Sequence, residues 1–421
     1  MLFRGRLRGD PVTASLKDTS VSLAADERYV ASWDLGGRLY SVWRFGRTWR
    51  RGLNGQVLHK TRDEAAPSVS AYDARERRTL SAGEARPVVD EAASFARDVL
   101  EAMLQAPADW ESDGAPPGRP EGPPYAPMAM ARLIERLRAC ALFDADAADA
   151  DAARFAQVYR PIGILPPDQY LSVVLQATEG CSFGTCTFCD LYRDGYRVKT
   201  AEEFGSHVRQ ALNYLGDSIQ LRRRSIFLGS ANALAVPMPR LVELFEAIQR
   251  GVPKPVPPVR AFVDAFTGVR KEAADYRRLR DLGLGRVYVG LESGHDPLLA
   301  FVRKPGTSAQ AVDMARAVKA AGVAVGAIVM IGLGGRDFSA GHEADTAAAV
   351  NAMDLGEGDI LYFSDLVEVP GTAYPAIAGR TGLTPLDLPA RLAQLDAIKA
   401  GLRFAGRGPQ MARYDIREFV Y

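Results

Sequence analysis

The central part of the chain alternates between two hydrophobic periods. Short β-rich apolar runs recur between positions 170 and 366, as LSVVLQA, SIFLG, AFVDAF, RVYVGLE, VAVGAIVMI and ILYFSDL. Between these runs, apolar residues return every three or four positions, as at Leu241, Leu244 and Ile248, which is typical of amphipathic helices. Six strands that each feed a helix predict an α/β fold with a parallel sheet, here a partial (β/α)6 TIM-like barrel.

The flanks follow different patterns. Positions 1–105 predict a small N-terminal β-meander and a helix: Tyr29 to Lys60 alternates apolar and polar residues around the turn pairs Gly36-Gly37 and Asn54-Gly55. Positions 106–127 are rich in Pro and Gly and predict a linker. We expect a helical connector at 128–169, the barrel at 170–366, and a C-terminal extension at 367–421 with a helical tail. The meander and the tail should cover the open side of the partial barrel.

Composition narrows the class of protein. The 421 residues are 47% hydrophobic and 24% charged, which is ordinary for a globular protein, and the formal net charge is only +1. A general field that attracts nucleic acid is therefore absent. No apolar run reaches the length of a membrane-spanning helix, and MLFRGRLRGDPVTASL lacks the apolar core of a secretory signal. We expect a cytoplasmic protein.

Three of the four cysteines lie within nine positions, just after the first strand of the predicted barrel. The segment is TEGCSFGTCTFCDLYRDGYRVKT, which spaces Cys181, Cys186 and Cys189 as C-x4-C-x2-C. Three thiolates on one loop can hold three irons of a 4Fe–4S cubane and leave the fourth iron open. Zinc is the rival, but it usually needs four protein ligands and would require a distant histidine here. The remaining Cys140 lies on a helical apolar stripe and is interpreted as a core thiol.

The cysteine loop resembles the cluster-binding loop of the radical S-adenosylmethionine (radical SAM) superfamily. That family usually spaces its cysteines as C-x3-C-x2-C, so this chain has one extra residue; a subset carries a GCS-x-x-x-C-x-F-C-like loop, which the segment from Gly180 to Cys189 resembles closely. The resemblance implies that Phe188 packs near the adenine. It also implies two cofactors, a 4Fe–4S cluster and S-adenosylmethionine.

Further motifs follow later strands. LGSANAL takes the place of a Gly-Gly-Glu-like motif that receives the cofactor's amino group, so Gly229, Ser230 and Asn232 stand there without a carboxylate. GLESGHDPLLAFVRKPGT is similar to the segment of the branch that holds the Elongator catalytic subunit and the methylthiotransferases. By this resemblance, further residues of the segment and of VGAIVMIGLGG contact the cofactor or lie near it: Glu292, Ser293, Lys304, Gly332 and Gly335.

The resemblance implies reductive cleavage of S-adenosylmethionine to a 5′-deoxyadenosyl radical, which takes hydrogen from a substrate C–H bond. An external donor such as flavodoxin or ferredoxin would supply the electron. Catalytic candidates are Asp264, at the end of AFVDAF, and Lys304. Asp264 could equally be a structural residue, and Asp365, His342 and Tyr414 are interpreted with the same caution.

The substrate stays open between classes. With no further cysteines for a second cluster, we favour a small-molecule or lipid-like substrate. The rival is an RNA- or protein-modifying enzyme, because Arg44, Arg50 and Arg51 lie among Trp33, Trp43 and Trp49, and basic residues with aromatics can bind single strands. A third class is a non-catalytic iron–sulfur protein.

Overall fold

The computed structural model describes residues 1–26, 28–62, 75–113, 125–192, 195–266, 270–369 and 371–421. The chain divides into two compact units. The first comprises Met1–Arg160, Ala211–Arg223 and Arg417–Tyr421, and the second comprises Pro161–Gln210 and Arg224–Ile416. In the described part of the chain, no helix is long and apolar enough to cross a membrane.

The first unit is built on a nine-stranded antiparallel sheet in the order β8-β7-β6-β5-β4-β3-β2-β1-β9. Its strands are β1 (Leu2–Leu7), β2 (Asp10–Leu16), β3 (Ser20–Ala25), β4 (Tyr29–Asp34), β5 (Leu39–Arg44), β6 (Arg47–Arg51), β7 (Val57–Arg62), β8 (Arg75–Thr79) and β9 (Glu111–Ser112). The meander therefore begins at Leu2, well before the alternation we used to predict it. Part of the predicted linker, 114–124, lies outside the described residues.

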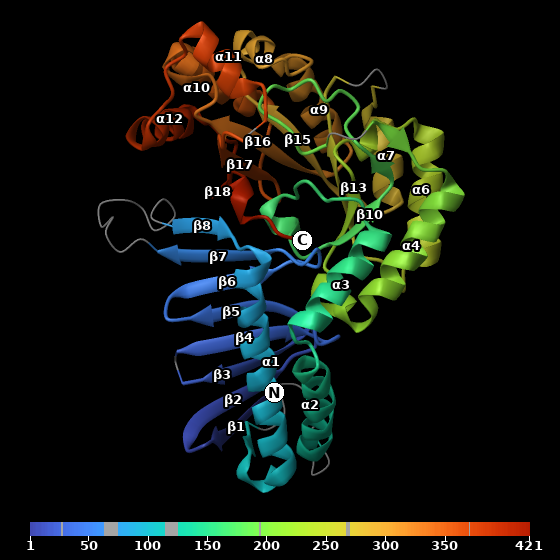
Figure 1. Ribbon diagram of the computed structural model, residues 1–421. Helices are drawn as coiled ribbons and strands as arrows, with labels where there is room; N and C mark the ends of the chain where they lie inside the picture. The colour runs from blue at the N-terminus through green and yellow to red at the C-terminus, as the bar shows by residue number, and fades with distance from the viewer. Residues whose placement is uncertain (27, 63–74, 114–124, 193–194, 267–269, 370) are drawn as a thin grey trace. The chain divides into compact units, whose positions relative to one another are not determined.

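One face of this sheet carries the apolar side chains. Along β2, Val12, Ala14 and Leu16 are buried in alternation with more exposed residues, as the two-residue period of a strand requires. Helix α1 (Ala82–Gln105) packs across this face, with α2 (Tyr125–Ala141) beside it (Figure 1). The side chain of Cys140 is fully buried in this core, and burial raises the pKa of its thiol above the usual range.

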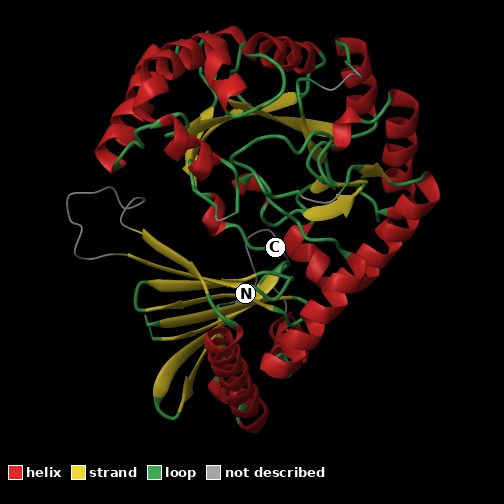
Figure 2. Cartoon of the chain, turned by 45° about the horizontal axis from the view of Figure 1, so that its top comes forward, coloured by secondary structure: helices red, strands yellow, loops and turns green. Residues whose placement is uncertain are grey.

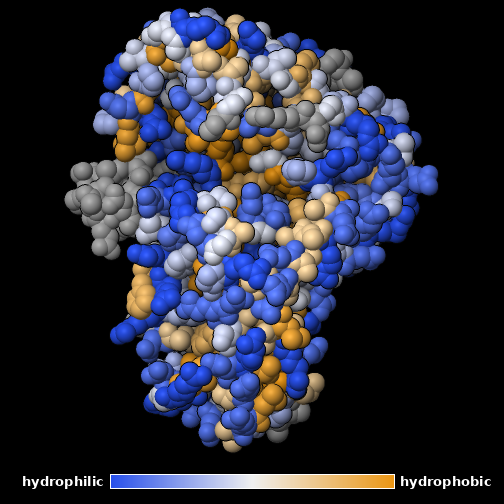
Figure 3. Space-filling view, viewed as in Figure 1, coloured by the Kyte–Doolittle hydropathy of each residue, from blue (hydrophilic) through white to orange (hydrophobic). Residues whose placement is uncertain are grey.

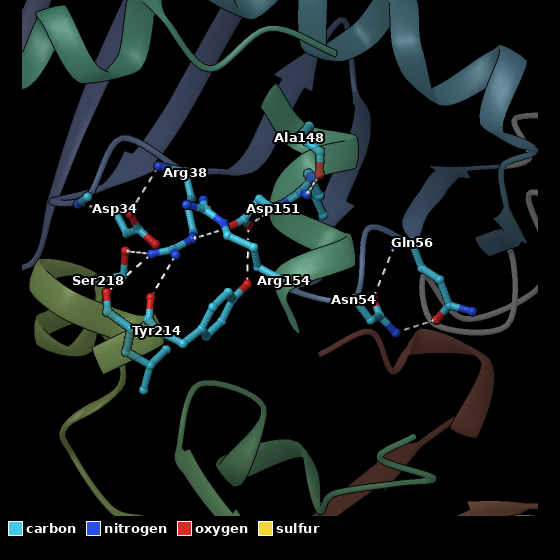
Figure 4. A network of polar contacts seen from close by, with 12 residues as sticks. Asp34, Arg38, Asn54, Gln56, Ala148, Asp151, Arg154, Tyr214 and Ser218 are labelled. Carbon is cyan, nitrogen blue, oxygen red and sulfur yellow. Dashed lines mark hydrogen bonds and ion pairs between the residues drawn. The ribbon is translucent and has the colours of Figure 1, made fainter. Parts of the chain in front are cut away.

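A buried ionic network joins distant segments within the first unit (Figure 4). Asp151, on α3 (Ala145–Val158), is fully buried and accepts a hydrogen bond from Arg38 Nε at 2.9 Å. The same guanidinium donates to the carbonyl of Tyr214 at 2.8 Å and to Ser218 Oγ at 2.6 Å. Because a lone buried charge is costly, each member of this group depends on the others.

The second unit contains a seven-stranded parallel sheet in the order β10-β13-β14-β15-β16-β17-β18. Its strands are β10 (Val173–Gln176), β13 (Ile226–Gly229), β14 (Val259–Val263), β15 (Leu284–Glu292), β16 (Ala324–Ile331), β17 (Ile360–Asp365) and β18 (Gln410–Tyr414). A two-stranded sheet, β11 (Thr178–Glu179) with β12 (Arg197–Val198), frames the cysteine loop. The six predicted strands are present, and the α/β partial-barrel class is confirmed.

Helices lie outside the curve of this sheet (Figure 2). The remaining helices of the chain are α4 (Ala201–Leu215), α5 (Ile219–Arg222), α6 (Met238–Gly251), α7 (Ala273–Asp281), α8 (Asp296–Phe301), α9 (Ser308–Ala320), α10 (Gly335–Ala352), α11 (Tyr374–Thr381) and α12 (Leu388–Gly401), with short 3-10 turns η1 (Pro107–Asp109), η2 (Pro167–Gln169), η3 (Gly216–Ser218), η4 (Ala233–Ala235) and η5 (Ile416–Glu418). The predicted helical tail is α12.

Two features at the barrel's open side were not assigned from the sequence. Strand β18 adds a seventh strand, which places Tyr414 opposite Ser364 of β17. The segment before β10 lies among the strands. Ile164 and Phe227 line the same small cavity, and the Asp168 carboxylate accepts hydrogen bonds from the hydroxyls of Tyr288 and Tyr362. Within the second unit, the strand-forming tail and this segment occupy the room that a partial barrel leaves.

Candidate radical SAM site

The cysteine loop opens into a cavity at the carboxyl ends of the strands, where parallel α/β enzymes usually bind ligands. The cavity has a volume of about 190 Å³, and apolar side chains show inside a hollow of the second unit (Figure 3). Its wall includes Cys181, Phe183, Cys186, Phe188, Cys189, Phe262, Asp264, Phe266, Glu292, Lys304, Ile328, Met330, Asp365, Leu366, Val367 and Tyr414. The structure thus brings together the three cysteines, one expected adenine contact and both catalytic candidates.

The loop is fastened to the segment that carries Lys304. Thr187 N–H donates to the carbonyl of Val302 at 2.9 Å, and Thr185 Oγ1 donates to the carbonyl of Arg303 at 3.1 Å. Gly180 and Gly184 adopt left-handed φ angles of 67° and 61°, a conformation that glycine takes without steric cost. The cysteine loop and the end of α8 therefore form one structural element of the site.

The three thiols share the cavity wall without converging on one point: no three His, Cys, Asp or Glu side chains in the described ranges form a group that could hold a single metal ion. In a cubane each thiolate binds its own iron, so a cluster-binding loop needs no such convergence. Burial raises the pKa of Cys186 to about 12 and also raises that of Cys189. Thiols become ligands by losing their protons to the metal site. The donor set fits a 4Fe–4S cluster.

Glu292 is directed into the cavity by a local distortion of β15. The register between β15 and β16 shifts between Gly290 and Glu292, and Glu292 has a φ of 59°. Such bulges redirect side chains and are frequent beside active sites. The Glu292 Oε1 atom lies 3.8 Å from Lys304 Nζ.

Asp264, Glu292 and Lys304 form a buried group of charges. Burial raises the pKa of both carboxyls, and the Lys304 ammonium opposes this rise. Burial alone would lower the pKa of Lys304, but the carboxylates of Glu292 and Asp264 outweigh it and leave that pKa above its usual value. With two acids and one base, the group can accept a further cationic or hydrogen-bonding group from a ligand.

Asn232 joins the cysteine loop to the end of β14. Its side chain is fully buried, its amide donates to Ser182 Oγ at 2.9 Å, and its oxygen accepts from Asp264 N–H at 2.9 Å. An amide oxygen has two lone pairs, so this contact leaves room for a second donor, and the expected role of Asn232 at the cofactor's amino group stays a prediction. Ala231 of the same motif lines the cavity.

Several expected cofactor contacts lie elsewhere within the described part of the chain. Gly229 and Ser230 border a small separate space inside the barrel. Ser293 is fully buried and bonded to His342 at 2.8 Å, and Gly332 N–H donates to Gln394 Oε1 at 2.8 Å. A side chain at Gly335 would meet the backbone of Thr384. Their roles in binding the cofactor stay predictions.

The sequence analysis assigned no role to part of the cavity wall. Phe262, Ile328 and Met330 come from strands β14 and β16, and a two-residue alternation toward the barrel interior could have found them. Asp365 pairs with Arg413 at 2.9 Å. That partner comes from β18, whose strand we did not predict.

A family model matches the part of the chain that carries the cysteine loop. Residues 175–343 match the model of the Radical SAM superfamily, a span that contains all three loop cysteines and Lys304. The match covers less than half of the chain, and over this span the chain carries a radical SAM domain. The superfamily's cofactors are a 4Fe–4S cluster and S-adenosylmethionine, as the motifs predicted. Comparison with curated protein sequences gave no match.

Solved structures that are similar to part of this chain include a radical SAM enzyme. Coproporphyrinogen III oxidase from Escherichia coli is 14% identical, with a TM-score of 0.41 over 58% of this chain and 54% of that one. Methylornithine synthase is 14% identical, with a TM-score of 0.39 over 60% and 68%. The archaeal Elp3 from Methanocaldococcus infernus is 11% identical, with a TM-score of 0.37 over 57% and 56%. This chain spans about half the length of the oxidase.

Proposed function

We propose that the chain is a cytoplasmic, oxygen-sensitive enzyme that cleaves S-adenosylmethionine reductively and acts on a small-molecule or lipid-like substrate. When bound, the cluster and S-adenosylmethionine would supply a 5′-deoxyadenosyl radical able to take hydrogen from a C–H bond. The observation that carries the proposal is one cavity lined by three loop cysteines, Glu292 and Lys304.

The residues of this chain have separate roles in that proposal. Cys181, Cys186 and Cys189 hold the cluster, and Glu292 with Lys304 binds the polar part of S-adenosylmethionine. The carboxylate of Glu292 and the ammonium of Lys304 each favour a ligand group of opposite charge or a hydrogen-bonding partner, so together they orient the cofactor. The apolar wall excludes water from the reacting atoms.

The wall also supports the substrate class. Beyond the charged group, the cavity is bounded by Phe262, Ile328, Met330, Leu366 and Val367. Apolar side chains with a few polar groups are typical of sites for small organic molecules. A mainly apolar substrate suits this wall, and an external flavodoxin- or ferredoxin-like donor would supply the electron for cleavage of S-adenosylmethionine.

The rival RNA substrate has less support. Its basis was the mixture of tryptophans and arginines in the N-terminal sheet. Trp33 is fully buried, Trp49 stacks on His59, and Trp43 is 36% exposed. A stacking surface for bases would need several exposed rings, so we favour the small molecule.

Anaerobic reconstitution tests the proposal. The protein should bind about four irons and four sulfides, and with dithionite and S-adenosylmethionine it should release 5′-deoxyadenosine. Cys186→Ala should abolish both, whereas Cys140→Ser, in the core of the first unit, should keep its iron. Purified protein that holds zinc and takes up no iron would refute the proposal.

A further inference from the structure

A tyrosine from the last strand forms part of the cavity wall. Tyr414 of β18 lines the cavity and is 8% exposed. Burial, and next the charge of Glu292, raises the pKa of its phenol above the usual range, and the phenol is hydrogen-bonded to Ser364. The side chain therefore keeps its O–H bond at neutral pH. A neutral phenol facing a reaction cavity can give up a hydrogen atom.

Tyr414 contacts a second buried tyrosine. The rings of Tyr414 and Tyr362 meet edge to face, with centroids 5.5 Å apart and planes at 79°. Tyr362 lies on β17, is 3% exposed, and donates its hydroxyl to Asp168 Oδ1 at 2.8 Å. Rings in contact at this distance exchange an electron readily, and the hydrogen bond gives Tyr362 an acceptor for its proton.

The line of tyrosines ends at the opposite, amino-terminal end of the strands. Asp168 Oδ2 accepts hydrogen bonds from Arg260 at 2.7 Å, from Arg286 at 2.8 Å and from Tyr288 at 2.6 Å. The side chains of Asp168 and Arg260 are each 23% exposed. The Asp168 end of the line is therefore partly open to solvent, whereas Tyr362 and Tyr414 are buried.

We propose that Tyr414 is the hydrogen-atom donor to a carbon radical in the cavity, and that Tyr362 and Asp168 restore it. The inference rests on the proposed function, which supplies the radical. A purely structural role would explain the ring contact, but it would require neither a phenol at the cavity wall nor a carboxylate accepting from Tyr362 beneath it.

The proposed transfer of hydrogen converts the Tyr414 phenol to a radical and then restores it. The O–H bond of Tyr414 breaks homolytically and a C–H bond forms at the carbon radical. Tyr414 regains an electron from Tyr362 and a proton from water at the cavity mouth, while Tyr362 passes its proton to Asp168. A one-electron donor protein of the iron–sulfur or flavin class then reduces Tyr362, which takes its proton back. The net change adds one electron and one proton to the carbon.

Deuterium transfer tests the donor. The holoenzyme is given S-adenosylmethionine and dithionite in D2O without added substrate, so that any atom transferred from an exchanged phenol is deuterium. We expect deuterated 5′-deoxyadenosine from the wild type and a several-fold lower deuterium content from Tyr414→Phe. Tyr276→Phe, which alters a buried tyrosine of α7, is the matched control and should behave as the wild type does.

Electron paramagnetic resonance gives a second readout. Samples frozen during the reaction should show a tyrosyl signal that ring-deuterated tyrosine narrows and that Tyr414→Phe removes. In Tyr362→Phe the tyrosyl signal should still form but should decay more slowly, because Tyr362 no longer supplies an electron to Tyr414. Wild-type 5′-deoxyadenosine with no deuterium, or with the same content in Tyr414→Phe, overturns the relay. Absence of 5′-deoxyadenosine altogether would instead refute the proposed function.

Discussion

Replacing Asn232 by Ala should loosen the cysteine loop specifically. The fully buried amide joins Ser182, next to the first cysteine, to the backbone of Asp264 at the end of β14. Both hydrogen bonds are 2.9 Å long. Alanine removes both and leaves the N–H group of Asp264 without this acceptor.

The expected loss of stability follows from these two bonds. Each contributes about 1 kcal/mol net, and an unsatisfied buried donor costs about 1–3 kcal/mol more. A total of about 3–5 kcal/mol would lower the melting temperature of a domain of this size by roughly 6–20 °C, at about 2–4 °C per kcal/mol.

Asn351 provides a matched control. Its amide donates to the carbonyl of Gly401 at 2.9 Å, and its oxygen accepts from Arg403 N–H at 2.7 Å. It lies on α10 and is half-buried. Asn351→Ala removes the same two kinds of bond, and we expect a smaller loss of about 1–2 kcal/mol because water can reach the site.

Cluster lifetime separates the two variants. Iron content and visible absorbance are followed in an iron chelator after anaerobic reconstitution, beside thermal unfolding. Asn232→Ala should lose its cluster several-fold faster than the wild type, whereas Asn351→Ala should melt earlier but keep the wild-type lifetime. If both variants retain the cluster equally, the amide does not hold the loop and the reasoning fails.

Three further substitutions have defined outcomes. Glu292→Gln should bind the cluster but weaken S-adenosylmethionine about 10- to 150-fold in equilibrium dialysis, since a charged hydrogen bond contributes roughly 1.5–3 kcal/mol; unchanged affinity would show that the carboxylate does not contact the cofactor. Lys304→Met should be less stable than the wild type by an amount that grows as pH rises above about 4, as measured in urea titrations. Burial raises the pKa of Glu292 and Asp264, and without the Lys304 ammonium their ionisation in the folded protein costs more stability; a pH-independent difference would contradict this. Gly163→Ala would place a Cβ 2.7 Å from the carbonyl oxygen of Leu191 and should cost about 1–3 kcal/mol of stability. Gly379→Ala, whose Cβ would contact nothing, should be neutral or stabilising by up to about 1 kcal/mol. Equal melting temperatures for the two variants would show that position 163 has room for a side chain.

The barrel strands were predictable because both faces of a parallel sheet are buried. Such strands appear as unbroken apolar runs, as ILYFSDL does with all six residues of β17 buried. Strand β18 has the sequence QMARY at the sheet edge, with two exposed positions at its start. Little in that composition distinguishes an edge strand from a loop, so the sequence analysis assigned only a helical tail there.

The candidate site likewise contains features that a sequence pattern shows and contacts that it does not. The cysteine spacing and the Glu292 segment are local in sequence and were readable as motifs. The contacts of Asp168 with Tyr362 and of Asn232 with Asp264 join residues 194 and 32 positions apart. One sequence contains no signal for pairs like these, because each partner alone is an ordinary polar residue. The expected cofactor contacts of Gly332 and Gly335 remain predictions.

The first unit shows why segment boundaries drawn from composition can mislead. It includes two pieces from far along the chain, Ala211–Arg223 and Arg417–Tyr421. Arg38, in the turn between β4 and β5, donates to Ser218 Oγ and to the carbonyl of Tyr214, and Glu418 accepts from Lys60 at 3.1 Å. Buried ion pairs stabilise poorly but are costly to break on one side only. An N-terminal truncation would leave these partners without their charges, so the sheet is part of the folding unit to which the chain's last residues belong.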